Sequence, residues 1–473
     1  MADPLAKLQN LTMKFGGTSL GSADAIRQAA EITKSALADS AEQVVVIASA
    51  VSGVTELLRD GTLDAASGND RYMQISEELR AKHEACAELL PTAEREAVLQ
   101  EIGPMIELYL QFCESVLVLG DAGPRALDHT MALGERMSVQ LLSAALRVIG
   151  LPAAVVDSGD LIVTDDRFQA AAPDMSATRE KVNRRLSPRL AKGELPVITG
   201  FIGATPGGVT TTLGRGGSDL SAGVIASSLG SDELWIWTDV DGVMTADPRV
   251  VPSARTIEAM EYREVRELSY FGARVLHPLT IQSVFESNTP VRVKNTFNPS
   301  NVGTLIVPHL EHENGAIKAI TAIPNVNLIT LEGKGMIGIP GIAARTFEAV
   351  ASTGASVLLI SQASSEQSIC FAIPRINAPA AVEALESEFE LALNRNNIDR
   401  VWAQDDITIV TVVGSGMKQT PGVAGQVFTA TGNHGINVVA IAQGSSECSI
   451  SLVVKSEDGD KAVRAIHQLV IEE

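Results

Sequence analysis

The sequence predicts an α/β protein in which a mostly parallel sheet flanked by helices is followed by two small α+β domains. Strand-like and helix-like stretches alternate up to about residue 300, which is the pattern of parallel strands joined by helices. The last third contains an internal repeat, and 473 residues are too many for one ordinary core. Hydrophobic residues make up 45% and charged residues 20%, as in a globular protein.

The elements of the first part follow from local patterns. Residues 23–38 place their apolar side chains near one helical face, and the apolar, β-branched run at 43–51 suits a strand buried on both faces. A long region at 71–150, rich in Glu, Leu and Ala, predicts helices. Further strands are expected at 153–157, 195–203 and 233–240. Right-handed crossovers between such strands bring ligands to their carboxyl ends.

Two copies of one unit fill the last third. Residues 331–373 match residues 412–454 at a constant offset of 81, so that Gly335 corresponds to Gly416. Each copy reads as strand, Gly/Pro loop, helix, strand, polar turn and strand. Because two copies are too few for a solenoid, we expect a pair of packed α+β domains.

The domain boundaries are expected in polar stretches between these patterns. The polar segment near 305–315 interrupts the pattern between the first part and the repeat. The predicted domains are therefore 1–308, 309–395 and 396–473.

Composition excludes several classes of function. The net charge of −20 argues against a nucleic-acid binder, which usually carries a basic face. No run reaches the roughly 18 to 20 apolar residues of a membrane span, and the N-terminus lacks the apolar core of a signal peptide. We therefore expect a cytoplasmic protein with no membrane partner. The four cysteines are scattered, without CxxC spacing or paired histidines, so we expect reduced thiols and no protein-bound metal.

Two glycine-rich loops suggest anion binding. "KFGGTS" (14–19) is expected between a strand and a helix, where backbone N–H groups and Lys14 could face a phosphate. Taken alone, it would equally well be a tight turn beside a solvated lysine. The loop "TTTLGRGGSD" (210–219) also precedes a helical pattern and carries Arg215 and Asp219. Together the loops suggest a site for two anionic groups that face each other.

Two further motifs are less specific. The segment 236–249 carries acidic residues after a strand, which could bind a ribose or Mg²⁺, although Asp241 and Gly242 alone favour a simple turn. A GxGxxG pattern begins at Gly333, but in the second copy Gln419 replaces its third glycine. A dinucleotide site is therefore not favoured, and the sequence has no Walker A loop.

The glycine loops, the segment 236–249 and "FGARVLHP" (271–278), in this order, resemble the signatures of aspartate kinase, in the amino-acid kinase superfamily. The terminal repeat resembles the tandem ACT domains of that family. The resemblance implies transfer of the γ-phosphoryl group of Mg²⁺-bound ATP to the β-carboxylate of L-aspartate. This is the first step towards lysine, threonine, methionine and isoleucine. Because a carboxylate is already an ionised nucleophile, such catalysis requires positioning and charge compensation.

The resemblance assigns roles around the acceptor. Lys14 and Asp219 would be catalytic, with Lys14 steadying the transferring group and Asp219 orienting Lys14. Arg215 would grip the α-carboxylate of aspartate, and Glu135 would receive its ammonium. For Glu135 the alternative is a solvated helix carboxylate. The remaining aspartate-side positions implied by the resemblance are Ser49, Thr55 and Ser218.

The resemblance also implies an ATP site. Its residues would be Lys14, Phe15, Gly16, Gly17, Thr238, Asp239, Met244, Arg249, Arg274 and Val275, with the two glycines supplying backbone N–H groups. Many relatives have Tyr at the position of Met244 and Lys at that of Arg274, so the adenine pocket differs in detail. His277 is expected to pack or cap rather than catalyse.

The ACT pair implies feedback regulation by an end-product amino acid. The implied effector residues are Met336, Ile339, Gly341, Gln362, Met417 and Gln443. Glutamines at the positions of Gln362 and Gln443 are associated with threonine in bifunctional relatives. Lysine-sensitive enzymes tend to have an acidic residue near the position of Leu358, so threonine is favoured over lysine. We also expect a homodimer or larger homo-oligomer formed through the ACT domains.

Two alternatives stay open at this point. One is another superfamily member that phosphorylates glutamate, acetylglutamate or a nucleotide. The other is a non-catalytic amino-acid sensor, against which the presence of Lys14, Glu135, Arg215 and Asp219 together argues. The end of the chain after the second repeat predicts that the dehydrogenase part of bifunctional relatives is absent, unless the chain is a fragment.

Overall fold

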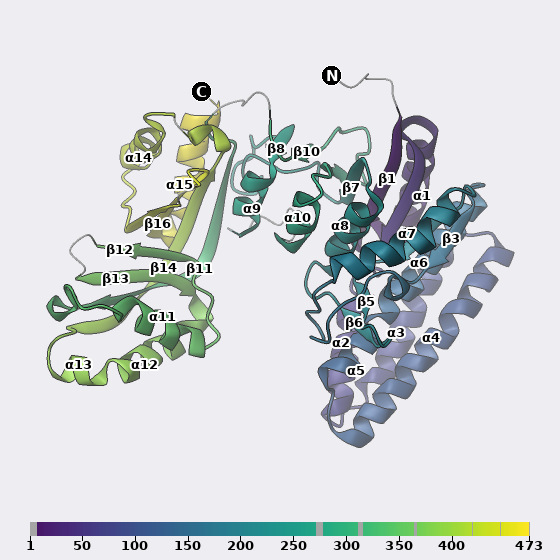
Figure 1. Cartoon of the computed structure of the whole chain (residues 1–473), viewed down its shortest axis with the longest axis horizontal. Helices are drawn as coiled ribbons and strands as arrows, with labels where there is room; N and C mark the ends of the chain where they lie inside the picture. Colours follow the sequence, from purple (N-terminus) through teal and green to yellow (C-terminus); the bar gives the residue numbers. More distant parts are fainter. Residues whose placement is uncertain are drawn as a thin grey trace. The chain divides into compact units, whose positions relative to one another are not determined.

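The computed structural model describes residues 7–270, 278–310, 316–363, 367–418, 420–444 and 446–472. The chain forms two compact units (Figure 1). The first unit comprises Met1–Val243, Thr256–Val265 and Arg274–Leu310. The second comprises Met244–Arg255, Arg266–Ala273 and Glu311–Glu473. The linear domain boundaries given above stay predictions.

The first unit is built on a mostly parallel sheet, as predicted. Among the described residues, eight strands follow the order β3-β4-β2-β1-β7-β9-β10-β8. They are β1 (Leu8–Phe15), β2 (Ala41–Ala48), β3 (Ala153–Val156), β4 (Leu195–Thr199), β7 (Glu233–Thr238), β8 (Ala259–Glu261), β9 (Val291–Asn295) and β10 (Thr304–Val307). The pairs from β3 through to β9 are parallel, whereas β9 and β10 are antiparallel. The central strands are almost wholly buried, which explains their continuous apolar runs.

Helices flank this sheet (Figure 1). They are α1 (Ala23–Ser35), α2 (Val54–Ala66), α3 (Arg71–Ala87), α4 (Thr92–Leu119), α5 (Pro124–Met131), α6 (Leu133–Val148), α7 (Met175–Leu190), α8 (Gly217–Leu229), α9 (Tyr262–Tyr270) and α10 (Pro278–Phe285). The predicted helical region 71–150 is confirmed as α3 to α6. The predicted strand 195–203 is instead two strands, β4 and β5 (Ile202–Ala204), and β5 pairs antiparallel with β6 (Thr210–Thr212). The chain bends between them at Phe201, which has a φ of 64°.

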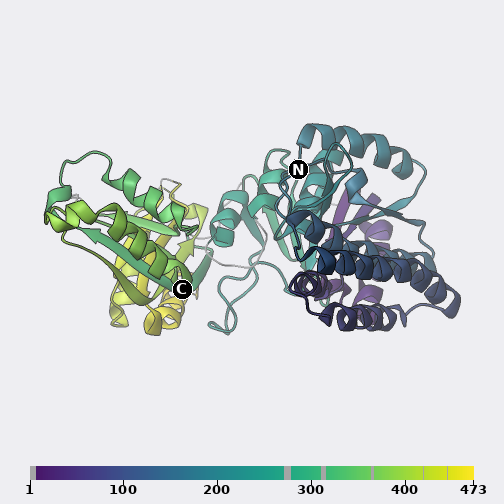
Figure 2. The same ribbon diagram turned by 90° about the horizontal axis from the view of Figure 1, so that it is seen from below.

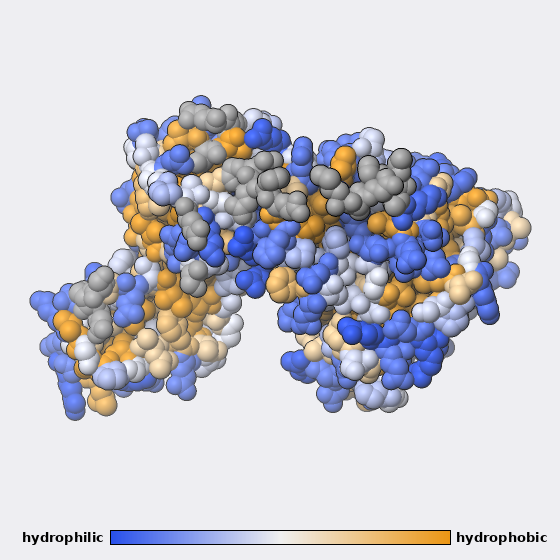
Figure 3. All heavy atoms as spheres, turned by 45° about the horizontal axis from the view of Figure 1, so that its top comes forward, coloured by the Kyte–Doolittle hydropathy of each residue, from blue (hydrophilic) through white to orange (hydrophobic). Residues whose placement is uncertain are grey.

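Helix α4 corrects one statement made from the sequence. By length and composition alone it is apolar enough to cross a membrane, the one such helix in the part of the chain described. In the structure it packs against α2, α3 and α6, and it buries Ile102, Ile106, Tyr109 and Cys113. These contacts bury 28% of its most apolar window. On the face shown in Figure 3, hydrophilic residues alternate with smaller hydrophobic areas.

The second unit contains the sequence repeat around an antiparallel sheet, seen in green and yellow in Figures 1 and 2. Its described strands follow the order β12-β13-β11-β14-β16-β15. They are β11 (Ala319–Glu332), β12 (Leu359–Gln362), β13 (Ser368–Pro374), β14 (Arg400–Val413), β15 (Ala440–Gln443) and β16 (Ser449–Lys455). Its helices are α11 (Ile342–Ser352), α12 (Ala378–Glu388), α13 (Glu390–Asn394), α14 (Val423–Asn433) and α15 (Ser456–His467). Each copy therefore has a second helix, α12 or α15, beyond the pattern that the sequence predicts.

The two copies exchange the segments that lead into their long strands. Strands β11 and β14 are antiparallel along their length, from Ala319 opposite Val413 to Glu332 opposite Arg400. Ile317 packs in the core that lies around α14 and α15, and Ile398 packs in the core around α11 and α12. A Cβ on Gly414 would lie 2.3 Å from the carbonyl oxygen of Ala316, so this approach requires glycine. Each hydrophobic core therefore contains residues from both sides of a linear boundary between the two copies.

Candidate active site

The strand ends of the first unit align in one row. Phe15 of β1 pairs with Ala48 of β2 and Trp237 of β7, and Ala48 pairs with Thr199 of β4. The segments that follow these residues therefore leave the same carboxyl edge of the sheet. This is the edge at which parallel α/β sheets bind ligands, so the predicted motifs are brought together there.

The first glycine loop differs from its expected form. The N–H of Gly16 donates to the carbonyl of Trp237 at 3.1 Å, so in this structure it is already paired within the protein. Gly17 has a φ of −60°, which other residues adopt easily, but a Cβ there would lie 3.2 Å from the Ala50 carbonyl oxygen. The glycines therefore permit close packing. The loop continues into a single 3-10 turn, and α1 begins later with its own cap at Ser22.

Lys14 lies beside the second glycine loop. Its Nζ is 2.5 Å from Oδ1 of Asp219, and both side chains are largely buried. Asp219 stands in the first turn of α8, which starts directly at the loop as predicted. Gly216 caps this helix at a φ of 71°, a conformation that favours glycine. The ion pair thus joins the two loops that the sequence singled out.

Glu135 is buried rather than solvated. It stands in the first turn of α6, with 3% of its surface exposed. The N–H of Ala50 donates to its Oε1 at 3.2 Å, whereas Oε2 is buried and has no hydrogen-bond partner among the described residues. Burial raises the pKa of Glu135 to about 8. A buried carboxylate oxygen without a donor is suited to receive an ammonium group from a ligand.

Small residues bring these elements together. A Cβ on Gly134 would lie 2.9 Å from that of Ala50, so α6 approaches the loop after β2 closely. A Cβ on Gly200 would lie 2.7 Å from the Cβ of Ser218, so the end of β4 lies against the first turn of α8. Gly200 is not among the predicted site residues, because it falls inside the predicted strand 195–203, whereas β4 ends at Thr199.

The remaining aspartate-side residues lie on segments that leave the same edge. Ser49 follows β2 and donates its N–H to the carbonyl of Phe15 at 3.1 Å. Thr55 lies in the first turn of α2 and Ser218 in that of α8, and both are partly exposed. Arg215 is exposed on the turn between Gly214 and Gly216.

The nucleotide-side residues are less closely assembled. The Phe15 side chain is fully buried and stacks on Trp237, with ring centroids 6.0 Å apart, so the ring belongs to the core. Thr238 ends β7, and its hydroxyl donates to the exposed Asp239 at 3.2 Å. The hydroxyl of Ser19, from "KFGGTS", forms a hydrogen bond with the hydroxyl of Thr296 at 2.7 Å. Sequence reasoning missed this contact between the first glycine loop and the segment after β9.

Two further nucleotide-side predictions, Met244 and Arg249, fall on a segment of the second unit. Arg249 is exposed and pairs with Asp247 at 2.6 Å. Arg274, Val275 and His277 lie outside the described residues.

The Asp-Gly turn is confirmed. The carboxylate of Asp241 accepts hydrogen bonds from the side-chain amides of Asn295 and Asn298, at 2.8 and 3.0 Å. Gly242 has a φ of 129° and packs tightly against Thr304. Within the described part of the chain, no group of three or more His, Cys, Asp or Glu side chains could hold a metal ion.

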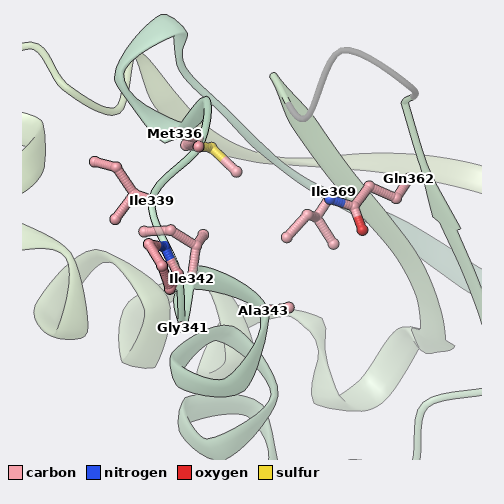
Figure 4. Close-up of a pocket in the computed structure, with 9 residues that line it drawn as sticks. Met336, Ile339, Gly341, Ile342, Ala343, Gln362 and Ile369 are labelled. Atoms are coloured by element: carbon pink, nitrogen blue, oxygen red, sulfur yellow. The ribbon is translucent and has the colours of Figure 1, made fainter.

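The second unit has a cavity of about 290 Å³ in its first repeat (Figure 4). Met336, Ile339 and Gly341 contribute from the Gly/Pro loop, and Gln362 and Ile369 from β12 and β13. Gly341, with a φ of 91°, precedes the first turn of α11. The other predicted effector residues lie at the equivalent places of the second repeat, with Met417 buried and Gln443 exposed.

The chain matches two known domain families and is similar to curated proteins. The profile of the amino acid kinase family matches residues 11–295, and that of the ACT domain matches 329–389 and 410–469. The bifunctional aspartokinase/homoserine dehydrogenase 1 of Arabidopsis thaliana is 38% identical over 461 residues, covering 96% of this chain and 50% of that protein. The chain thus spans about half the length of such curated relatives.

Two further relatives match over nearly their whole length. The aspartokinase of Saccharomyces cerevisiae is 31% identical, with 98% of this chain and 93% of that protein covered. The crystal structure of Escherichia coli aspartokinase III with aspartate and ADP is 30% identical, with a TM-score of 0.80 and 98% and 100% coverage. The fold and site define a member of the amino acid kinase family with C-terminal ACT domains. Within that family, the chain belongs to the aspartokinases.

Proposed function

We propose that this chain is an aspartate kinase, which transfers the γ-phosphoryl group of ATP to the β-carboxylate of L-aspartate to give 4-phospho-L-aspartate. One observation carries the proposal. The Lys14–Asp219 ion pair and the buried Glu135, with an oxygen free for a donor, belong to segments at one carboxyl edge of the sheet. A cation for transferring phosphate and a receptor for an amino group are what this reaction requires.

On the acceptor side, Glu135 receives the substrate ammonium through Oε2, and Arg215 binds the α-carboxylate. Two opposite charges at fixed places orient the amino acid and leave its β-carboxylate pointing away from them, towards Lys14. The glycines on either side of Arg215 let its turn approach the ligand closely. The β-carboxylate attacks as the ionised species, so the site needs no general base.

On the donor side, Lys14 offsets the charge of the phosphoryl oxygens as the two anions approach. Asp219 holds the ammonium of Lys14 in place, at 2.5 Å. Thr238 and Asp239, at the end of β7, are proposed to face the nucleoside. Mg²⁺ enters with ATP as part of the substrate and supplies charge neutralisation at the phosphates.

A coupled assay of ADP formation tests the proposal and its rivals. L-Aspartate is compared with L-glutamate and N-acetyl-L-glutamate at equal concentrations with Mg-ATP. Turnover with aspartate alone supports the proposal. Preference for either of the other acceptors identifies a different family member, and no turnover with effector binding retained identifies a sensor.

The cavity of the first repeat is proposed to bind a feedback amino acid, with threonine favoured over lysine. Among the described lining residues, the side chains are apolar except for Gln362, which offers a neutral amide. The N-terminus of α11 suits the effector carboxylate, whereas a lysine ammonium would find no acidic partner among these residues. E. coli aspartokinase III has been solved with lysine, so the two effectors must be compared directly.

Isothermal titration with each amino acid makes that comparison. Binding of threonine with weak or absent lysine binding supports the proposal, and tight lysine binding without threonine binding contradicts it. Association through the ACT domains into a homodimer or larger oligomer, and a cytoplasmic role in the synthesis of lysine and threonine, belong to the same proposal. Sedimentation of the full chain tests the oligomer.

A further inference from the structure

A buried carboxylate outside the proposed site holds two loops together. Asp128 lies on α5 and is fully buried. It accepts the N–H of Gln169 at 3.0 and 3.1 Å, the N–H of Thr212 at 2.9 Å and the hydroxyl of Thr212 at 2.6 Å. Burial raises the pKa of Asp128, while these hydrogen bonds lower it. The charge is thus stabilised by oriented donors on two separate segments.

These donors flank the turn that carries Arg215. Thr212 is the last residue of β6, three residues before Arg215. Gln169 has a φ of 67°, which is uncommon for a residue with a side chain, so its conformation needs support from its surroundings. A Cβ on Gly214 would lie 2.7 Å from the carbonyl oxygen of Gln169. The two segments are therefore in close contact at the base of the turn.

We propose that Asp128 is a positioning residue for the acceptor: by holding Thr212 and Gln169 it fixes the Gly214–Gly216 turn and thereby Arg215. The inference rests on the proposed function, in which Arg215 binds the α-carboxylate. Arg215 is exposed, so packing does not hold its side chain, and the backbone of the turn sets where that side chain starts. Its turn has an anchor at each end, namely Asp128 on the β6 side and the first turn of α8 on the other. Backbone hydrogen bonds add to the first anchor, because the N–H of Leu213 donates to the carbonyl of Phe201 at 2.9 Å and that of Ala171 to the carbonyl of Thr212 at 3.0 Å.

The two anchors predict a separation of kinetic effects. Loss of the Asp128 anchor loosens the β6 end of the turn, which then keeps only its backbone hydrogen bonds. The Lys14–Asp219 pair is retained, because Asp219 is held by α8 and its packing. Aspartate binding should therefore weaken while ATP binding is preserved. A general loss of stability would instead reduce the amount of active enzyme and leave the KM for aspartate unchanged.

The first test uses Asp128→Asn, which keeps the shape but turns one acceptor oxygen into a donor that faces other donors. We expect the KM for aspartate to rise about 10-fold or more, with the KM for ATP within about 2-fold of its original value. Asp165→Asn is the matched control. Asp165 lies on the same loop as Gln169, accepts the N–H of Ala172 at 2.9 Å and pairs with Arg167. Its substitution should leave the KM for aspartate unchanged.

A second pair of variants applies if Asp128→Asn fails to fold. Thr212→Val removes only the hydroxyl donor and should raise the KM for aspartate by a smaller factor, about 3-fold or more. Thr212→Ser keeps the hydroxyl and should restore the original value. Equal KM values for the Val and Ser variants would overturn the proposed role.

Hydrogen exchange tests, independently of the reaction, whether Asp128 holds the turn. In Asp128→Asn or Thr212→Val, peptides that cover Thr212 and the Gly214–Gly216 turn should exchange faster than in the original chain or in Asp165→Asn. Unchanged exchange would refute the proposal that Asp128 fixes the turn, whichever substrate the enzyme phosphorylates. Faster exchange with an unchanged KM for aspartate would refute the positioning role. Absence of aspartate kinase activity in the original chain, with the exchange result intact, would refute the proposed function and with it the role towards Arg215.

Discussion

Glu135→Gln should stabilise the free protein at high pH while it destroys the proposed ammonium site. Burial raises the pKa of Glu135 from 4.5 to about 8, because the charged form has lost its water and the N–H of Ala50 compensates for this loss only in part. Glutamine keeps an oxygen for that N–H and a similar shape, and it cannot ionise. The substitution therefore isolates the effect of burying one charge.

The magnitude follows from the two pKa values. The difference between 4.5 and about 8 corresponds to about 5 kcal/mol, at 1.36 kcal/mol for each pKa unit. Because the folded pKa is raised, the folded protein keeps a proton that the unfolded chain releases above pH 4.5. Stability is therefore lost as the pH rises from about 4.5 through about 8, and no more is lost above that range. At pH 9 the Gln variant should be more stable by up to about 5 kcal/mol, and at pH 5 by little.

Unfolding midpoints measured from pH 5 to pH 9 test this expectation. Glu101→Gln, on the exposed side of α4, is the control for the loss of a surface carboxylate. If the difference between Glu135→Gln and the original chain were constant across this range, or if the variant were less stable at pH 9, the reasoning about Glu135 would be refuted.

Three further predictions concern the site. Lys14→Ala should lower kcat by about 100-fold or more through loss of charge compensation, whereas the exposed Lys192→Ala should not; equal kcat values in a coupled ADP assay would contradict this. Gly200→Ala should lower both activity and Tm, because its Cβ would lie 2.7 Å from that of Ser218. Gly207→Ala, whose Cβ would make an ordinary contact of 3.8 Å with the Thr205 hydroxyl, should be neutral by calorimetry and assay. Aspartate binding at pH 7 should release close to one proton from Glu135, seen by titration calorimetry in buffers of different ionisation enthalpy, and fewer protons at pH 9; no buffer dependence would contradict the ammonium contact.

Sequence patterns predicted the parts of the fold that local chemistry determines. The continuous apolar runs gave the buried parallel strands, and the helical region 71–150 became α3 to α6. The second glycine loop also has the expected form, since Gly216 caps α8 and Asp219 lies within the first turn of that helix. These features depend on spacing along the chain, which a sequence displays directly.

Features that depend on tertiary contacts were not predictable in the same way. The burial of Glu135 results from the close approach of Gly134 to Ala50, residues far apart in the chain. Similarly, Gly16 follows β1, and its N–H is taken by the carbonyl of Trp237, which only the sheet order places beside it. A match between the two copies cannot reveal that they exchange the segments before β11 and β14, because the exchange affects both copies in the same way.

Trapping of the product tests the central claim most directly. The chain is incubated with Mg-ATP and L-aspartate in the presence of hydroxylamine, which converts an acyl phosphate to a hydroxamate. The proposed reaction predicts the β-hydroxamate of aspartate in equal amount to ADP, and about 100-fold less of both products with Lys14→Ala. Formation of ADP without the hydroxamate, or a hydroxamate only from glutamate or N-acetylglutamate, would contradict it.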